Sequence, residues 1–256
     1  MNILVRKAIR DLWRSKLRTI AIISAIALSV GLGIGLVNAT QDALESFDKR
    51  LEITNYEDID IHFDMTNLSL DEVRSVEGVE EVMGRIFIKT QTSVGGEKFK
   101  THWVASPYYE EKPYSKINGY QLTEGYYVSS ADSSECLIGN LFSEQNDVGT
   151  GDNVTLLYNN VSVDLEVSGV AASPEYLYVV SEEGWPEPSL LLPLFTTYEL
   201  ASEILDLDDG VYNEILITVK DGYDAEKVKE NVEGLLTKSG VRISKSLLGT
   251  EELDYQ

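Results

Sequence analysis

Few residues of this 256-residue chain have the types and spacing that catalysis or metal binding requires. The two histidines, His62 and His102, stand far apart, and neither belongs to an H-x-x-H or C-x-x-C pattern of the kind that holds zinc. We therefore expect both to be ordinary strand residues. Cys136 is the only cysteine, so the chain cannot form an internal disulfide.

Motifs for nucleotide and acyl-transfer chemistry are also missing from the sequence. The chain has neither the G-x-x-x-x-G-K-[ST] loop that cradles phosphates nor the G-x-S-x-G turn of serine hydrolases. Adjacent acids such as Glu80 and Glu81 point apart on a strand or a helix, and we expect them to be solvated. The sequence thus predicts no enzyme, no catalytic residue and no cofactor or metal site.

The most informative segment, residues 1–18, is basic and runs directly into an apolar stretch. Six of the 21 Lys and Arg residues lie before Thr19, against one of the 43 acids, Asp11. Apolar residues of the segment recur at helical spacing, with the bases on the other face. This pattern predicts an amphipathic helix that lies on the cytoplasmic surface of a membrane.

Residues 19–39 carry no charge and, as a helix, reach roughly 31 Å, close to the hydrocarbon thickness of a bilayer. We expect a transmembrane helix here, continuing outside to about residue 53. The preceding bases predict a cytoplasmic N-terminus in the plasma membrane, with residues after about 40 extracytoplasmic. Val37, Asn38 and Ala39 also fit a loose signal-peptide cleavage pattern, but the apolar stretch is longer than such signals usually are. We therefore favour an uncleaved anchor.

The rest of the chain is strongly acidic, with 15 basic and 42 acidic residues beyond residue 18. This charge repels phosphate backbones, so nucleic acid is excluded as a partner. Cationic substrates or divalent ions are conceivable partners. A solvated acidic surface that maintains solubility is the interpretation we favour.

The extracytoplasmic part opens with a strand–helix–strand pattern. Residues 58–63 alternate between apolar and polar side chains, as on a half-buried strand, and a capping box at Ser69 starts a short helix. A long strand over 79–94 then turns through Gly95-Gly96 into a hairpin.

The same pattern returns near the other end of the chain. A strand over 214–219 precedes a helix that Asp224 caps, and another strand follows. Two such units, far apart in sequence, indicate one α+β subdomain assembled from residues 54–105 and 211–246.

Residues 106–210 have many turn signals between short β-type runs, which predicts an inserted, mainly β subdomain. A second capping box, at Thr196, predicts a helix within it. The insert is rich in tyrosine, including Tyr108 and Tyr109. An exposed tyrosine cluster is one way to build a recognition surface, but tyrosines more often fill half-buried strand faces, which is the interpretation we favour.

Several motifs resemble those of one family. Residues 8–19 are similar to the A-hydrophobic-R-x-L-x-R-x-K-x-R-T approach to the first membrane helix of MacB/FtsX-like ABC transporter permeases. Further resemblances to that family's extracytoplasmic core follow in the same order, at Leu70–Val82, Leu122–Gly125, Ile138–Leu141, Val148–Val154, Val167–Val170 and Ile215–Leu236.

The resemblance implies an α+β outer domain with a porter-like part and an inserted β-rich part, between the first two of usually four membrane helices. It also implies a cytoplasmic ABC ATPase subunit that binds the ATP, and a second permease copy, identical or different. Charged residues near the inner surface would contact that ATPase or anionic lipid headgroups, although topogenic charge alone explains any single one of them. These residues are Arg10, Asp11, Arg14, Lys16 and Arg18.

The chain departs from this family by stopping at Gln256 with one membrane helix. We expect residues 247–256 to be a tail that leads to a second membrane helix in a longer protein. The predicted function is a permease subunit of an ABC-type export or mechanotransmission complex, which couples ATP hydrolysis to extracytoplasmic substrate handling. The alternative is a single-pass anchored binding or adhesion domain, which has no obvious need for the basic segment.

Overall fold

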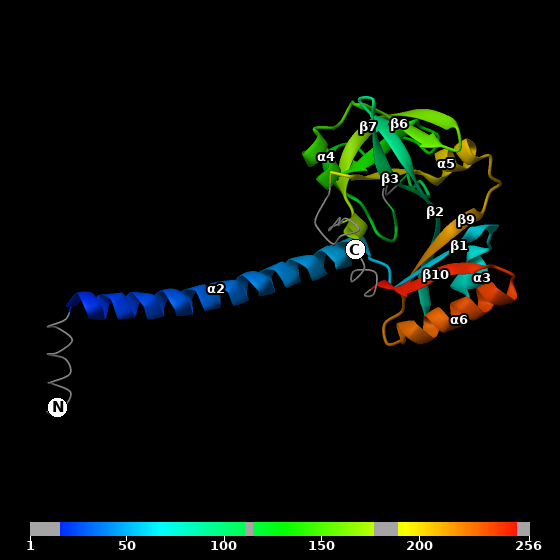
Figure 1. The fold of residues 1–256 in the computed structure, drawn as a ribbon. Coiled ribbons are helices and arrows are strands. Elements are labelled where there is room, and N and C mark those ends of the chain that lie inside the picture. Colours follow the sequence, from blue (N-terminus) through cyan, green and yellow to red (C-terminus); the bar gives the residue numbers. More distant parts are fainter. Residues whose placement is uncertain (1–15, 111–114, 177–188, 250–256) are drawn as a thin grey trace. The chain divides into compact units, whose positions relative to one another are not determined.

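The computed structural model describes residues 16–110, 115–176 and 189–249 (Figure 1). It divides into two compact units, Met1–Arg50 and Leu51–Gln256. The described part of the first unit is helical, and the strands of the described residues lie in the second.

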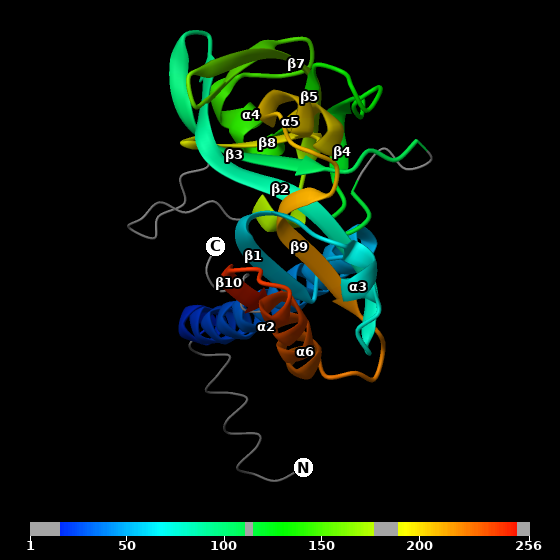
Figure 2. The ribbon, with the colours of Figure 1, turned by 90° about the vertical axis from the view of Figure 1, so that its right-hand side faces the viewer.

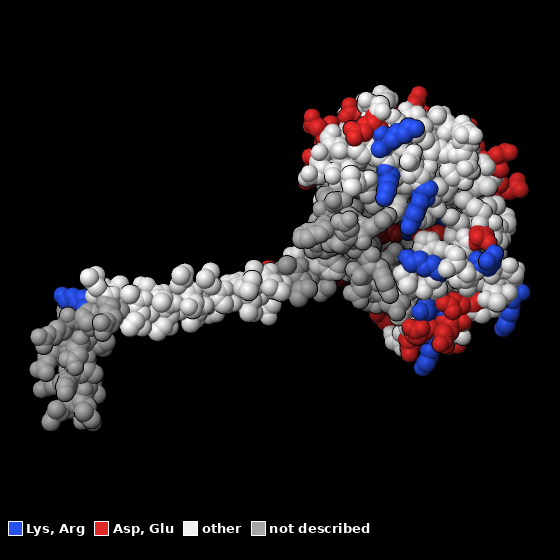
Figure 3. All heavy atoms as spheres, viewed as in Figure 1, with Lys and Arg blue, Asp and Glu red and all other residues white. Residues whose placement is uncertain are grey.

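The described residues of the first unit, 16–50, belong to one long helix, α2 (Lys16–Thr54), of 39 residues. Its part Ile20–Thr54 reaches a mean hydropathy of 2.5 and is long and apolar enough to cross a membrane. Its aliphatic side chains are exposed, and its uncharged middle is white in Figure 3. The predicted apolar helix is therefore confirmed. The amphipathic helix predicted before it falls, over residues 1–15, outside the described residues.

The first and last described strands of the second unit belong to one antiparallel sheet. Its strands β1 (Ile59–Asn67), β2 (Val79–Val94), β9 (Val211–Val219) and β10 (Ile243–Leu248) lie in the order β10-β1-β9-β2. Strands from the two ends of the second unit therefore pair directly.

Two helices, α3 (Leu70–Arg74) and α6 (Ala225–Lys238), cover one face of this sheet (Figure 2). The Asp224 side chain caps α6 by accepting a hydrogen bond from the backbone N–H of Glu226 at 3.1 Å. Ser69 stands at the N-cap of α3, but within the described residues its side chain makes no capping hydrogen bond, so the predicted capping box is not formed.

Strand β2 runs from the four-stranded sheet into a hairpin. Residues 79–85 pair with β9, and residues 86–94 pair with β3 (Glu97–Ser106) across the hairpin. Gly95 and Gly96 make the turn with positive φ angles of 58° and 92°, a conformation that glycine adopts at low cost.

Beyond the hairpin, six strands close into a ring. Strand β3 lies parallel to β8 (Leu191–Thr197), which pairs with β5 (Glu135–Gly139). Strand β5 lies parallel to β7 (Val161–Ala172), and β6 (Asn153–Tyr158) joins β7 back to β2. Strand β4 (Gln121–Gly125) pairs with β7 outside the ring. The remaining described elements are α4 (Asn140–Asn146), the 3-10 turn η1 (Pro174–Tyr176) and α5 (Tyr198–Leu205). The side chain that caps α5 is Thr197, one residue beyond the predicted Thr196.

The ring has its own hydrophobic core, which includes Trp103 and Ala105 of β3. The Trp103 indole N–H donates to Thr196 Oγ1 at 2.8 Å, so even its polar atom is bonded. The β2–β3 hairpin, which begins directly after Arg85, contributes to this core. We therefore propose that the insert begins within β2, after Arg85, rather than after residue 105. The division into subdomains remains a proposal.

Candidate functional site

The candidate site lies on the face of the four-stranded sheet opposite α3 and α6. Side chains alternate along β1, so Ile59 and Ile61 join the helix-covered core while Asp60 and His62 point to the other face. The register places His62 opposite Glu214 of β9, and Glu214 opposite Arg85 of β2. Three adjacent strands thus present a row of ionisable side chains.

Arg85 is the centre of this row and is 3% exposed. Its Nε donates to Glu214, and its two terminal nitrogens donate to both oxygens of Glu175, with a separation of 3.0 Å from Nη1 to Oε2. Burial works against the charged guanidinium, but the two carboxylates outweigh burial and raise the pKa of Arg85. Burial likewise raises the pKa of Glu214, but Arg85 and His62 overcome this effect and lower it overall.

His62 extends the network towards β10. Its Nε2 lies 2.7 Å from Asp60 Oδ2 and 3.2 Å from Glu214 Oε1. Burial lowers the pKa of His62, but the hydrogen bond to Asp60 and the nearby carboxylates outweigh burial and raise it above its ordinary value. The imidazole is 17% exposed, whereas Asp60 and Glu214 are each 1% exposed. His62 is therefore the group through which solvent reaches this end of the network.

Residues 115–119 cover the network and tie it to the end of α2. Ile117 packs against Met83 and Leu216 on this face of the sheet. Asn118 is fully buried, and its Nδ2 donates to Glu175 Oε1 at 2.8 Å.

Thr54 and Asn55, which belong to the same compact unit as the sheet, accept hydrogen bonds from this loop. The backbone N–H of Asn118 donates to the Asn55 carbonyl at 3.1 Å, and that of Gly119 donates to the Thr54 carbonyl at 2.7 Å. Asn118 Oδ1 also accepts from the backbone N–H of Glu57 at 2.9 Å. A continuous hydrogen-bonded path therefore runs from the C-terminal end of α2 to Glu175 and Arg85.

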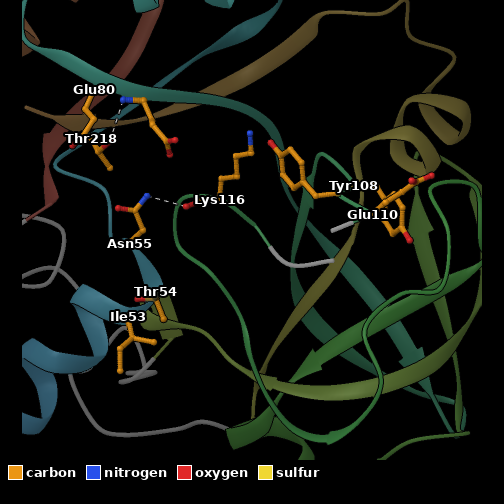
Figure 4. Close-up of a pocket in the computed structure, with 10 residues that line it drawn as sticks. Ile53, Thr54, Asn55, Glu80, Tyr108, Glu110, Lys116 and Thr218 are labelled. Atoms are coloured by element: carbon orange, nitrogen blue, oxygen red, sulfur yellow. Dashed lines mark hydrogen bonds between the residues drawn. The ribbon is translucent and has the colours of Figure 1, made fainter. Parts of the chain in front are cut away.

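An open groove of about 740 Å³ lies beside this loop (Figure 4). The Lys116 ammonium group lies 4.8 Å from the centre of the Tyr109 ring, and Asn55 Nδ2 donates to the Lys116 carbonyl. Its volume is in the range of small-molecule sites, but such sites are mostly apolar and enclosed, whereas this groove is open and mostly polar. The lining residues are Ile53, Thr54, Asn55, Glu80, Glu81, Tyr108, Tyr109, Glu110, Lys116 and Thr218.

The site residues predicted from sequence belong to the first compact unit. Arg10, Asp11 and Arg14 fall outside the described residues, whereas Lys16 and Arg18 lie in the first turn of α2. The predicted contacts with an ATPase or with lipid remain untested.

The two histidines have different surroundings. His102 lies in β3, packs edge-on against Phe87, and is 3.3 Å from the Tyr176 hydroxyl through Nδ1. His62 is also a strand residue, as predicted, but its contacts with two carboxylates were not foreseen. The available signal was that Asp60 and His62 share one face of the alternating strand.

The sequence of the chain matches a known family. The MacB-like periplasmic core domain family matches residues 19–235. The chain belongs to this family. A relative in Methanocaldococcus jannaschii, the uncharacterized ABC transporter permease MJ1507, is 26% identical over 197 residues, which are 73% of this chain. The chain spans 44% of the length of that relative.

Solved structures of two outer domains are also similar. The periplasmic region of MacB from Actinobacillus actinomycetemcomitans has a TM-score of 0.49 at 12% identity, covering 82% of this chain and 97% of that one. The extracellular domain of YknZ, from Gram-positive bacteria, has a TM-score of 0.46 at 9% identity, covering 74% and 98%. The family assignment rests on the sequence match. The chain is thus an extracytoplasmic domain of the ABC permease type, α+β in fold, with one apolar N-terminal helix.

Proposed function

We propose that the chain is the first membrane helix and outer domain of a permease subunit in an ABC-type export or mechanotransmission complex. In this proposal α2 crosses the plasma membrane with its N-terminus in the cytoplasm, where a separate ABC ATPase binds and hydrolyses ATP. A second permease copy completes the complex, and this chain is not itself an enzyme. The family membership, the name of the M. jannaschii relative and the bases before Thr19 support the proposal.

The observation that carries the coupling role is the hydrogen-bonded path from the end of α2 to Arg85. Asn118 bonds both to the backbone next to Thr54 and to Glu175, which follows the ring strand β7. Arg85 then joins Glu175 to Glu214 of the four-stranded sheet. A displacement of the helix end therefore acts on the one strand that passes from the sheet into the ring.

This arrangement suits a domain that transmits movement. Fully bonded, buried polar groups adopt discrete arrangements rather than yielding gradually, so a network of this kind can pass on a displacement. In our proposal, ATP-driven movement of the membrane helices changes the angle between the sheet and the ring, and the substrate is handled by the outer domain.

The proposal is tested by isolating the native gene product from its own membranes. It would be purified in mild detergent and its partners identified by mass spectrometry. We expect a P-loop ATPase in about equal amounts and a parent protein longer than these 256 residues. Recovery of a 256-residue protein without an ATPase would contradict the proposal and leave the anchored binding domain as the better description.

A further inference from the structure

We infer that Asp60, His62 and Glu214 form a binding site for a divalent transition-metal ion of the Zn²⁺ type. The three side chains come from two neighbouring strands, β1 and β9, and each directs one ligand atom to a common point. These atoms, Asp60 Oδ2, His62 Nε2 and Glu214 Oε1, all lie within 4.8 Å of one another. One imidazole and two carboxylates are a ligand set that suits Zn²⁺ and similar ions better than Mg²⁺ or Ca²⁺, which prefer oxygen alone.

The separations fit such an ion after a small adjustment. Ligand atoms about 2.1 Å from a tetrahedral ion lie about 3.4 Å apart. His62 Nε2 is 3.2 Å from Glu214 Oε1 and 2.7 Å from Asp60 Oδ2. The first pair is already near this separation, the second must open by roughly 0.7 Å, and the ligand atoms of Asp60 and Glu214 lie within 4.8 Å of each other. A water molecule or another ligand then takes the fourth corner.

The second oxygen of Glu214 is held by Arg85, which leaves Oε1 directed at His62. Metal-binding carboxylates are commonly oriented by such a second partner, which fixes the carboxylate before the ion arrives. Arg85 is in turn fixed by Glu175, so the orientation does not depend on one flexible side chain.

The charges of the network also favour a divalent cation. The contacting buried groups include three carboxylates, those of Asp60, Glu175 and Glu214, and one guanidinium, that of Arg85. Carboxylates in this group therefore outnumber the guanidinium, an excess that favours a cation. Lys245 of β10 lies opposite His62 in the register, and its charge acts on both His62 and Glu214, so it offsets part of this excess.

A bound ion would fasten β1 to β9 next to Arg85. The partly exposed imidazole of His62 gives the ion a route from solvent to the buried carboxylates. The inference depends on the geometry of the outer domain and is independent of the proposed transport function. It departs from the sequence-based expectation that His62 is an ordinary strand residue.

The test uses the full chain in detergent, stripped with a chelator and then titrated with Zn²⁺. We expect about one Zn²⁺ per chain by elemental analysis. At a hundredfold excess over the dissociation constant, the thermal midpoint should rise by about 5 °C or more. Co²⁺ should give visible absorption bands typical of a tetrahedral site, and Mg²⁺ or Ca²⁺ at the same concentration should leave the midpoint unchanged.

The two histidines provide a matched pair of variants. His62→Gln should abolish the Co²⁺ bands and the Zn²⁺-dependent shift, whereas His102→Gln should retain both. Asp60→Asn, checked for folding by circular dichroism, should weaken Zn²⁺ binding at least tenfold and serves if His62→Gln does not fold. Failure of the native chain to bind Zn²⁺, or unchanged binding in His62→Gln, would overturn the inference. The triad would then be an ion-pair network only.

Discussion

Arg85 and Glu214 face each other at the last pair of the β2–β9 ladder, and the Arg85 Nε donates a hydrogen bond to the Glu214 carboxylate. The next residue of β2, Ile86, already pairs with β3 of the ring. The ion pair therefore marks the point where β2 leaves the sheet. Because Arg85 also binds Glu175, which follows ring strand β7, one guanidinium joins the sheet to the segment that leaves the ring.

Removing the guanidinium should strongly destabilise the outer domain. Arg85→Met leaves the buried carboxylates of Glu175 and Glu214 without their cation, a change that typically costs about 3–5 kcal/mol. The free energy of unfolding in urea is the measurement. Arg74→Met is the matched control, because Arg74 pairs with Asp71 on the surface, where such pairs contribute about 1 kcal/mol or less. Equal losses in the two variants would contradict the role given to Arg85.

Removing the Asn118 side chain should loosen both ends of the path that it joins. Asn118 has a positive φ of 55°, so Asn118→Gly removes the amide without straining the backbone. We expect faster hydrogen exchange at Glu57, whose N–H loses its acceptor, and also around Glu175. Asn67→Gly, which removes an exposed amide bonded to the Asp209 carbonyl, should leave both regions unchanged. A change confined to Glu57 would show that the path does not transmit the perturbation.

Substitution of glycine by alanine should have opposite effects on stability at Gly84 and at Gly234. A Cβ at Gly84 would lie 2.7 Å from atoms of the Tyr212 ring, which packs against both hydrophobic cores. Gly84→Ala should therefore destabilise the domain by about 1–3 kcal/mol. Gly234→Ala, in α6 with open space around its Cα, should stabilise it by about 0.5–1 kcal/mol. Thermal unfolding of both variants decides the comparison.

The elements that sequence reasoning predicted well are those with local signals. Alternating side chains and the Gly95-Gly96 turn predict β2 with the bounds Val79–Val94 that the structure has. The cap at Asp224 likewise predicts the start of α6. At Thr196, by contrast, two consecutive threonines offer the same capping chemistry, and only the length of β8 selects Thr197.

The network could not be predicted because its members are distant in sequence and typical of solvated strand faces. Arg85 lies 90 residues from Glu175 and 129 from Glu214. Alternation correctly assigns Asp60 and His62 to one face, but alternation alone does not reveal that residues 115–119 and η1 bury that face. The closure of the ring through β6 is a long-range pairing of the same kind.

The buried imidazole of His102 should make the folded outer domain less stable in mild acid. Burial, aided by Lys89 across the hairpin and only partly offset by Glu214, lowers the pKa of His102 to about 4. Phe87 and the Tyr176 hydroxyl also face the imidazole of His102. The unfolded chain takes up this proton near pH 6.5 and the folded chain only near pH 4, so stability falls as pH decreases through that window.

The expected loss is at most about 1.4 kcal/mol per pH unit, and His102→Gln should remove it. Urea unfolding of the native chain and of the variant, compared at pH 7 and pH 5, isolates the contribution because the carboxylates of the network are common to both proteins. The stability of the native chain relative to the variant should decrease by roughly 1–2 kcal/mol between these pH values. Parallel pH profiles would mean that the folded protein accommodates a protonated His102, and hence that the Phe87 side of β3 is more hydrated than its packing indicates.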